Sequence, residues 1–129
     1  MPQLRSNGID HLNLHVQSLE KTMDFYHRLL GFRELEDLPD DNGKIIGDAK
    51  AKLAIYEVEG FPKYEKHGLS HIGFNIANFD DVEERCSEIG AEILYGGVVQ
   101  WPGTRSIYVK DPNGYELELT EVWGADLAK

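Results

Sequence analysis

Two histidines and one glutamate are the residues of this sequence best suited to metal chemistry. His11 and His71 each lie near the start of a segment that alternates polar and apolar residues, and Glu118 lies within a third such segment. Two neutral imidazoles and one carboxylate suit Fe2+, Mn2+, Ni2+ or Zn2+, and three protein ligands leave coordination positions open for a substrate. The pattern therefore predicts a metal-dependent enzyme with one divalent ion per site, held by His11, His71 and Glu118.

The segments that carry these residues are predicted to be strands with one apolar and one polar face. Residues two apart in a strand share a face, because successive side chains point to opposite sides. In the segment Ile9–Val16 the apolar face is formed by Leu12, Leu14 and Val16, and the segment with His71 is expected to be a strand over Leu69–Ile76. A single histidine or glutamate on a strand is more often a solvated surface group than a ligand, but three strands with the same sidedness favour a shared site. The polar faces carry His11, Asn13, His71 and Glu118.

An internal repeat relates the two histidines. Each half of the chain has a strand, an amphipathic helix and three further strands, in βαβββ modules of about residues 8–59 and 69–122. The segment Gly60–Gly68 mixes proline, glycine and charge, as a surface linker does. One module cannot bury both faces of its sheet alone. The expected fold is therefore of the α+β class, with two βαβββ modules in tandem and a curved mixed sheet that forms a cup with the helices outside.

Capping residues predict where the two helices begin and end. The first helix is expected to begin at Ser18, a good N-cap, and to end at Gly31, because glycine best tolerates the left-handed conformation after a helix. The second is expected to begin around residues 78–81 and to end at Gly90. A returning strand is then predicted over residues 91–94.

Composition limits the classes of partner. The length of 129 residues indicates a single domain over residues 1–129. The net charge of −10 argues against nucleic acid or an anionic membrane surface as partners. Cys86 is the only cysteine, so no disulfide within the chain is expected. No segment has the apolar length of a membrane span or a signal peptide, so a cytoplasmic location is expected.

Four stretches of the sequence resemble the vicinal oxygen chelate superfamily, which includes glyoxalase I, extradiol dioxygenases, fosfomycin-resistance enzymes and bleomycin-resistance proteins. The similarity extends over most of the chain, from Gly8 to Val122. The last stretch contains Asp111-Pro112-Asn113-Gly114, which is also a hairpin turn on physical grounds. The four stretches are Ile9–Leu12, Asp24–Phe32, Ser70–Phe74 and Tyr108–Leu119.

The resemblance implies a metal ion at the floor of the cup and a small-molecule substrate that chelates it. The ligand positions it implies are His11, Ala54, His71 and Glu118 of this chain. It also implies a homodimer in which two equivalent sites are shared across the interface. No residue is assigned to an organic cofactor.

Ala54 is the departure from this pattern that bears on the reaction. In glyoxalase I the corresponding position carries a second glutamate, which serves as ligand and base, and a methyl group can do neither. The sequence therefore argues against glyoxalase I activity. Tyr56, two residues further along the same face, is a candidate catalytic residue, although a phenol with a pKa near 10 is a poor base.

Three functions remain open. Dioxygenase chemistry is slightly favoured, with Tyr108 and Tyr56 as candidate catalytic residues and Trp101 and Asn13 beside the substrate. A fosfomycin-type enzyme that opens an epoxide is the first alternative, since the resemblance implies that Ser106 and Tyr108 hold the substrate there. Arg105 has the wrong strand parity to share their face. The second alternative is a drug-binding protein of the bleomycin-resistance kind, without catalysis.

Overall fold

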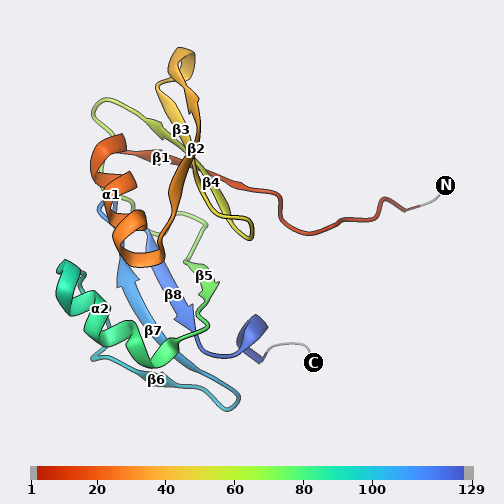
Figure 1. Cartoon of the computed structure of the whole chain (residues 1–129), viewed down its shortest axis with the longest axis vertical. Helices are drawn as coiled ribbons and strands as arrows, with labels where there is room; N and C mark the ends of the chain where they lie inside the picture. The colour runs from red at the N-terminus through yellow and green to blue at the C-terminus, as the bar shows by residue number, and fades with distance from the viewer. Residues whose placement is uncertain (1–2, 127–129) are drawn as a thin grey trace. The chain divides into compact units, whose positions relative to one another are not determined.

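The computed structural model describes residues 3–126 and divides into two units, Met1–Phe61 and Pro62–Lys129. Each unit contains one βαβββ module with a four-stranded mixed sheet, which confirms the predicted fold class (Figure 1). That the two sheets together form a cup stays a prediction, as does a single domain over residues 1–129. Among the described residues, no helix is long and apolar enough to cross a membrane.

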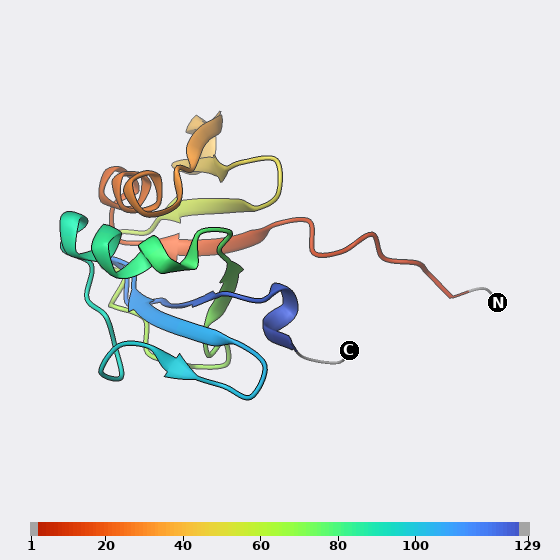
Figure 2. The same cartoon turned by 60° about the horizontal axis from the view of Figure 1, so that its bottom comes forward.

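The first unit has the sheet order β1-β4-β3-β2, in which β1 is parallel to β4 and the other neighbours are antiparallel. The helix α1 lies on one side of this sheet (Figure 2). Leu14 and Val16 are buried, whereas Asn13 and His15 are exposed, so the predicted alternation is confirmed. The elements are β1 (Leu12–Val16), α1 (Leu19–Leu30), β2 (Arg33–Leu38), η1 (Pro39–Asp41), β3 (Gly43–Gly47) and β4 (Lys52–Glu57).

The helix α1 begins and ends at the predicted residues. The side chain of Ser18 accepts a hydrogen bond from the backbone N–H of Lys21, which satisfies one donor that the first helical turn leaves without a partner. At the other end Gly31 has φ of 73°, a left-handed conformation that costs glycine little. Tyr26, whose side chain is fully buried, fixes the helix to the core.

The second unit has the same topology, with the sheet order β5-β8-β7-β6. Here β5 is parallel to β8, and β7 is antiparallel to both of its neighbours. Val82 and Cys86 of α2 are buried, and Gly90 ends this helix with φ of 71°, as predicted. The elements are β5 (Ile72–Asn75), η2 (Phe79–Asp81), α2 (Val82–Ile89), β6 (Val99–Gln100), β7 (Arg105–Lys110), β8 (Glu116–Thr120) and η3 (Trp123–Asp126).

The strand predicted over residues 91–94 is wrong in its extent. Only Ile93 pairs with β7, as an isolated bridge to Val109, and pairing resumes at β6. Between these two points Tyr95, Gly96 and Gly97 have positive φ values of 57°, 79° and 112°. A run of positive φ cannot continue a strand, so the edge of this sheet is interrupted.

The first strand of each module is shorter than the sequence predicted. The strand expected over Ile9–Val16 begins at Leu12, and the one expected over Leu69–Ile76 covers Ile72–Asn75. His11 and His71 therefore each lie one residue before a strand. The two histidines keep equivalent places in the repeat.

The linker between the modules is fastened to the turn that joins β7 to β8. The backbone N–H of Tyr64 donates to the carbonyl of Asn113 at 2.7 Å, and the Tyr64 ring stacks on Tyr115 with centroids 4.6 Å apart. A Cβ at Gly114 would come within 2.8 Å of the Tyr64 carbonyl oxygen, so only glycine fits there. The linker segment that precedes His71 is thus held by the turn, although most of its residues are exposed.

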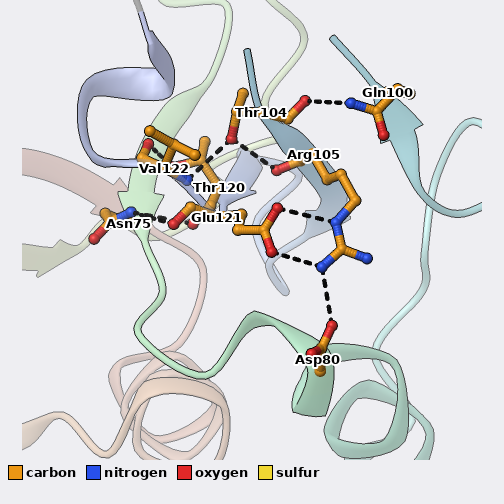
Figure 3. A network of polar contacts seen from close by, with 8 residues as sticks. All are labelled: Asn75, Asp80, Gln100, Thr104, Arg105, Thr120, Glu121 and Val122. Carbon is orange, nitrogen blue, oxygen red and sulfur yellow. Dashed lines mark hydrogen bonds and ion pairs between the residues drawn. The ribbon is translucent and has the colours of Figure 1, made fainter. Parts of the chain in front are cut away.

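Arg105 lies at the opposite end of β7 in a network of polar contacts (Figure 3). Its guanidinium donates to both carboxylate oxygens of Glu121, at 3.0 and 2.6 Å, and to Asp80 at 2.9 Å. It also stacks over the Phe79 ring at 4.9 Å. These contacts lie away from the strand positions of Ser106 and Tyr108, which confirms the predicted parity of Arg105.

Candidate metal centre

His71 and Glu118 meet in the second unit. Nε2 of His71 lies 2.9 Å from Oε1 of Glu118, and the parallel register of β5 and β8 places Gly73 beside Glu118. The Glu118 side chain is 12% exposed and that of His71 is 36% exposed, so the carboxylate is mostly withdrawn from water while the imidazole is accessible. A nitrogen and an oxygen of the kinds that can ligate a metal ion therefore face one another.

The remaining polar atoms of both side chains are held by serines. The hydroxyl of Ser106 donates to Oε2 of Glu118 at 2.7 Å, and Ser106 is fully buried. The hydroxyl of Ser70 lies 3.1 Å from Nδ1 of His71. Partners of this kind fix the orientation of metal ligands. They leave Oε1 and Nε2 as the pair that can bind an ion.

Tyr108 stands directly beside this pair. It is opposite Glu118 in the register of β7 and β8, and its ring meets the His71 ring edge to face at 5.8 Å. Burial raises the pKa of Tyr108, and the nearby charge of Glu118 raises it further. The phenol therefore stays protonated at neutral pH and is suited to donate a proton or a hydrogen bond, not to act as a base.

Trp101 also contacts Tyr108. A side-chain hydrogen bond from Trp101 acts to lower the pKa of Tyr108, against the larger effects of burial and Glu118. Trp101 is 43% exposed. Two of the predicted substrate-pocket residues thus lie near Tyr108 and Glu118 in the second unit. They are Trp101 and Ser106.

A second carboxylate, Glu116, lies two residues before Glu118 and was not singled out from the sequence. It is only 5% exposed, and it accepts from the Tyr95 hydroxyl and from Nζ of Lys66, which lies 3.2 Å from Oε1. These contacts raise the pKa of Lys66, with Glu116 as the main cause. The alternation of β8 could have indicated Glu116, since it shares the face of Glu118. Its partners could not have been found, because they lie in a loop and in the linker.

His11 belongs to the first unit. Its Nδ1 lies 2.7 Å from Oδ1 of Asp10, and this contact lowers the pKa of Asp10. Both side chains are exposed, at 47% and 91%. A carboxylate on Nδ1 orients an imidazole so that Nε2 is presented to a metal.

The strand register confirms that Ala54 is the repeat equivalent of Glu118. In the first unit Ala54 is beside Asn13, two residues after His11, and in the second Glu118 is beside Gly73, two residues after His71. Ala54 is 2% exposed. A buried methyl group therefore occupies the place of a carboxylate.

Tyr56 and Asn13 lie on strands of the first unit. Tyr56 pairs with Gly43 in the register of β3 and β4, and a Cβ at Gly43 would come within 2.6 Å of the Tyr56 ring. Gly43 thus makes room for the Tyr56 ring. Asn13 is exposed on β1. Roles for Tyr56 and Asn13 at the site stay predictions.

The donor set present is suited to a divalent metal ion but is incomplete within the second unit. Among residues 3–126, no group of three or more His, Cys, Asp and Glu side chains is arranged to hold a metal ion. The second unit supplies one imidazole nitrogen and one carboxylate oxygen, 2.9 Å apart. This chemistry fits Mn2+, Fe2+, Ni2+ or Zn2+. His11 as the third ligand stays a prediction.

Comparisons with known proteins agree with this chemistry. A family model described as the Glyoxalase/Bleomycin resistance protein/Dioxygenase superfamily matches residues 8–119. The metallothiol transferase FosB of Staphylococcus haemolyticus is 30% identical over 115 residues, which cover 87% of this chain and 81% of that protein. The virulence protein STM3117 of Salmonella typhimurium is 30% identical over 125 residues, 92% of this chain and 87% of that protein.

A solved structure shares the fold. The fosfomycin resistance protein FosX of Listeria monocytogenes, complexed with Mn(II) and sulfate, superposes with a TM-score of 0.74. The sequences are 25% identical, and the match covers 91% of each chain.

Proposed function

Because the chain belongs to the glyoxalase/bleomycin resistance protein/dioxygenase superfamily, we propose that it is an enzyme that depends on a divalent metal ion held by His71, Glu118 and His11. The observation that carries this proposal is the 2.9 Å approach of His71 Nε2 to Glu118 Oε1. Ser70 and Ser106 hold the other polar atoms of both side chains. FosX has been solved in complex with Mn(II), and FosB is described as a metallothiol transferase, so both proteins support the same kind of site.

The reaction proposed is the addition of a thiol or of water to an electrophilic carbon of a small substrate, in which the new bond forms as a carbon–oxygen bond breaks and the proton of the thiol or water replaces the one that Tyr108 gives to the released oxygen. The bound ion would polarise two vicinal oxygens of that substrate. The sequence alone placed dioxygenase chemistry slightly ahead, but the similarity to FosB and FosX favours addition. Proton abstraction from carbon needs a base, which Ala54 cannot supply. Addition needs a proton donor for the oxygen released from carbon, and protonated Tyr108 is suited to that role.

Dioxygenase activity is retained as a second candidate because of the aromatic surroundings of Tyr108. Tyr108 contacts the rings of His71 and Tyr95. Such surroundings suit a flat ring substrate. The drug-binding alternative predicts no metal dependence, so one metal assay separates it from both enzymatic functions.

The third ligand is proposed to be His11 of the same chain or of a second copy in a homodimer. If the sites are shared, a dimer of one His11→Ala chain and one Glu118→Ala chain contains one intact site. A random mixture of the two variants should therefore bind at most about one metal ion per two dimers. Sites formed within one chain would show no restoration. Sedimentation of the unmixed protein gives its oligomeric state.

Mn(II) binding tests the proposal. Electron paramagnetic resonance of free Mn(II) should give about one bound ion per chain, and His71→Ala, Glu118→Ala and His11→Ala should each weaken binding by about 100-fold or more. His67→Ala, which removes another exposed histidine of the second unit, should leave binding unchanged. Binding that survives in the His71 and Glu118 variants would contradict the proposed site.

Oxygen uptake separates the two reactions. Protein loaded anaerobically with Fe(II) is supplied with a panel of catechols, and the addition reaction predicts no uptake above the rate of free Fe(II). Uptake that depends on Glu118 would instead favour the dioxygenase candidate. Loss of an epoxide in the presence of a thiol, followed by mass spectrometry of the adduct, is the positive test for addition.

A further inference from the structure

Tyr108 lies at the centre of an aromatic cluster on the side of the candidate metal ligands. The Tyr95 ring meets Tyr108 edge to face at 5.3 Å, and His71 meets it in the same way at 5.8 Å. Trp101 lies near enough to the Tyr108 phenol for its side chain to act on the pKa of that group, in the direction that lowers it. Tyr108 itself is only 7% exposed, so its neighbours form the surface that a ligand would meet.

Tyr95 is brought into this cluster by an unfavourable backbone. Its φ of 57° is rare for a bulky residue, and glycine or asparagine is usual there. With Gly96 and Gly97 it interrupts the edge that pairs with β7. Residues held in sparsely populated conformations occur preferentially at functional sites. The strained residue here is an aromatic one beside the predicted ligands.

A buried carboxylate and an exposed lysine hold the Tyr95 side chain in place. Its hydroxyl donates to Glu116, which is 5% exposed, and Nζ of Lys66 lies 3.3 Å from the same hydroxyl. Tyr95 is nevertheless 61% exposed. Because the hydroxyl is anchored to a buried carboxylate, the ring is fixed while much of the residue remains open to solvent.

Trp101 is fixed in a comparable way. Its backbone N–H donates to the carbonyl of Thr104 at 2.8 Å across the turn between β6 and β7, and its side chain acts on the pKa of Tyr108. It is 43% exposed. Two exposed aromatic residues thus lie near Tyr108, which is itself opposite Glu118, and the Tyr95 ring contacts the Tyr108 ring directly.

We infer that Tyr95 and Trp101 form an aromatic wall that selects substrates with a flat aromatic or conjugated group attached to their metal-binding oxygens. This inference rests on the proposed function, because the wall would act on a ligand that is chelated at His71 and Glu118. Rigid aromatic side chains bind flat apolar groups with little loss of conformational entropy. Tyr95 and Trp101 are therefore specificity-determining residues, and a small aliphatic substrate would leave them unused.

Two hydroxamates that share one chelating group test the wall on Co(II)-loaded protein. Benzohydroxamate carries a phenyl ring and acetohydroxamate a methyl group, and both affinities are measured from the Co(II) absorption band relative to Co(II) in buffer. Benzohydroxamate should bind about tenfold more tightly than acetohydroxamate, as expected when the wall covers one face of its phenyl ring. Tyr95→Asn removes the ring but tolerates the positive φ. It should abolish most of this preference without changing the affinity for acetohydroxamate or Co(II).

Three further variants sharpen the test. Tyr95→Phe keeps the ring and should keep most of the preference, and Trp101→Ala should lose part of it. Trp123→Phe should retain it, and because the chain has two tryptophans this variant leaves Trp101 as the only one. Benzohydroxamate should then quench Trp101 fluorescence more strongly than acetohydroxamate does.

The outcomes separate the inference from the proposed function. Equal hydroxamate affinities on a protein that binds Co(II), or a preference unchanged in both Tyr95→Asn and Trp101→Ala, would overturn the aromatic wall alone. A protein that binds no Co(II) would overturn the proposed function and the inference together. A ring preference that falls in both wall variants, at constant Co(II) affinity, would support both.

Discussion

Ser106 donates its hydroxyl to Oε2 of Glu118 at 2.7 Å, from a fully buried position on the neighbouring strand. The contact joins β7 to β8 and determines which carboxylate oxygen is presented to His71. A side chain that the sequence suggested as a substrate contact therefore orients a candidate ligand.

Removing this hydroxyl should weaken metal binding. Ser106→Ala is expected to reduce Mn(II) affinity about tenfold to 100-fold, because the carboxylate loses the bond that orients it. The free energy of unfolding should fall by about 1–2 kcal/mol, since a buried oxygen is left without its partner. Mn(II) titration and urea unfolding of the same sample measure both effects. Ser87→Ala, at an exposed position of α2, is the control and should change neither.

Gly43→Ala should destabilise the first unit. The added Cβ would come within 2.6 Å of the Tyr56 ring, so the ring or the strand must shift, at an expected cost of about 1–3 kcal/mol in the free energy of unfolding. Gly73→Ala is the matched control, because its Cβ would have no atom within 4 Å. A Tyr56→Ala background should remove most of the cost of Gly43→Ala. Urea unfolding of the double-mutant cycle checks this, and additive effects would argue against the clash.

The ion pair of Glu121 with Arg105 predicts a dependence of stability on pH. Arg105 lowers the pKa of Glu121 below its ordinary value of 4.5, so ionised Glu121 favours the folded state. A depressed folded pKa contributes stability above the unfolded pKa, and the contribution is lost as pH falls through the folded pKa. The difference in Tm between wild type and Glu121→Gln should be constant from neutral pH to about 5 and then shrink as pH falls. A difference that grows in acid would contradict this assignment.

Ala54→Glu would test the repeat relationship. A carboxylate at this buried position lacks a partner without metal, and the free energy of unfolding should fall by about 2–4 kcal/mol. If position 54 faces His11 as Glu118 faces His71, saturating Mn(II) should recover part of that loss. Thermal unfolding with and without Mn(II) measures the recovery. Ala77→Glu, at an exposed position, should show neither loss nor recovery.

Local periodicity was sufficient to predict which face of β1 is buried, whereas both faces of β8 are buried. Leu14 and Val16 are buried while Asn13 and His15 are exposed, because alternation in a strand leaves no other sidedness. The ends of α1 were equally predictable from Ser18 and Gly31, since a cap acts within one turn.

Contacts between distant segments could not be predicted from local patterns. Glu116 contacts Lys66 of the linker and Tyr95 of a loop. The sequence separations between Glu116 and these two residues carry no periodic signal. The interrupted edge at Tyr95 was missed because a strand pattern of alternating residues says nothing about which residue takes a positive φ. The sequence therefore proposes candidate ligands but does not identify the residues that surround them.

The interruption at Tyr95, Gly96 and Gly97 has a consequence for association between chains. An uninterrupted outer strand presents a row of unpaired backbone donors and acceptors, on which another chain can add a strand and begin an aggregate. Here β6 is only two residues long, and the pairing before it is a single bridge. The same break that turns Tyr95 toward Tyr108 thus shortens the template available for intermolecular β-sheet growth.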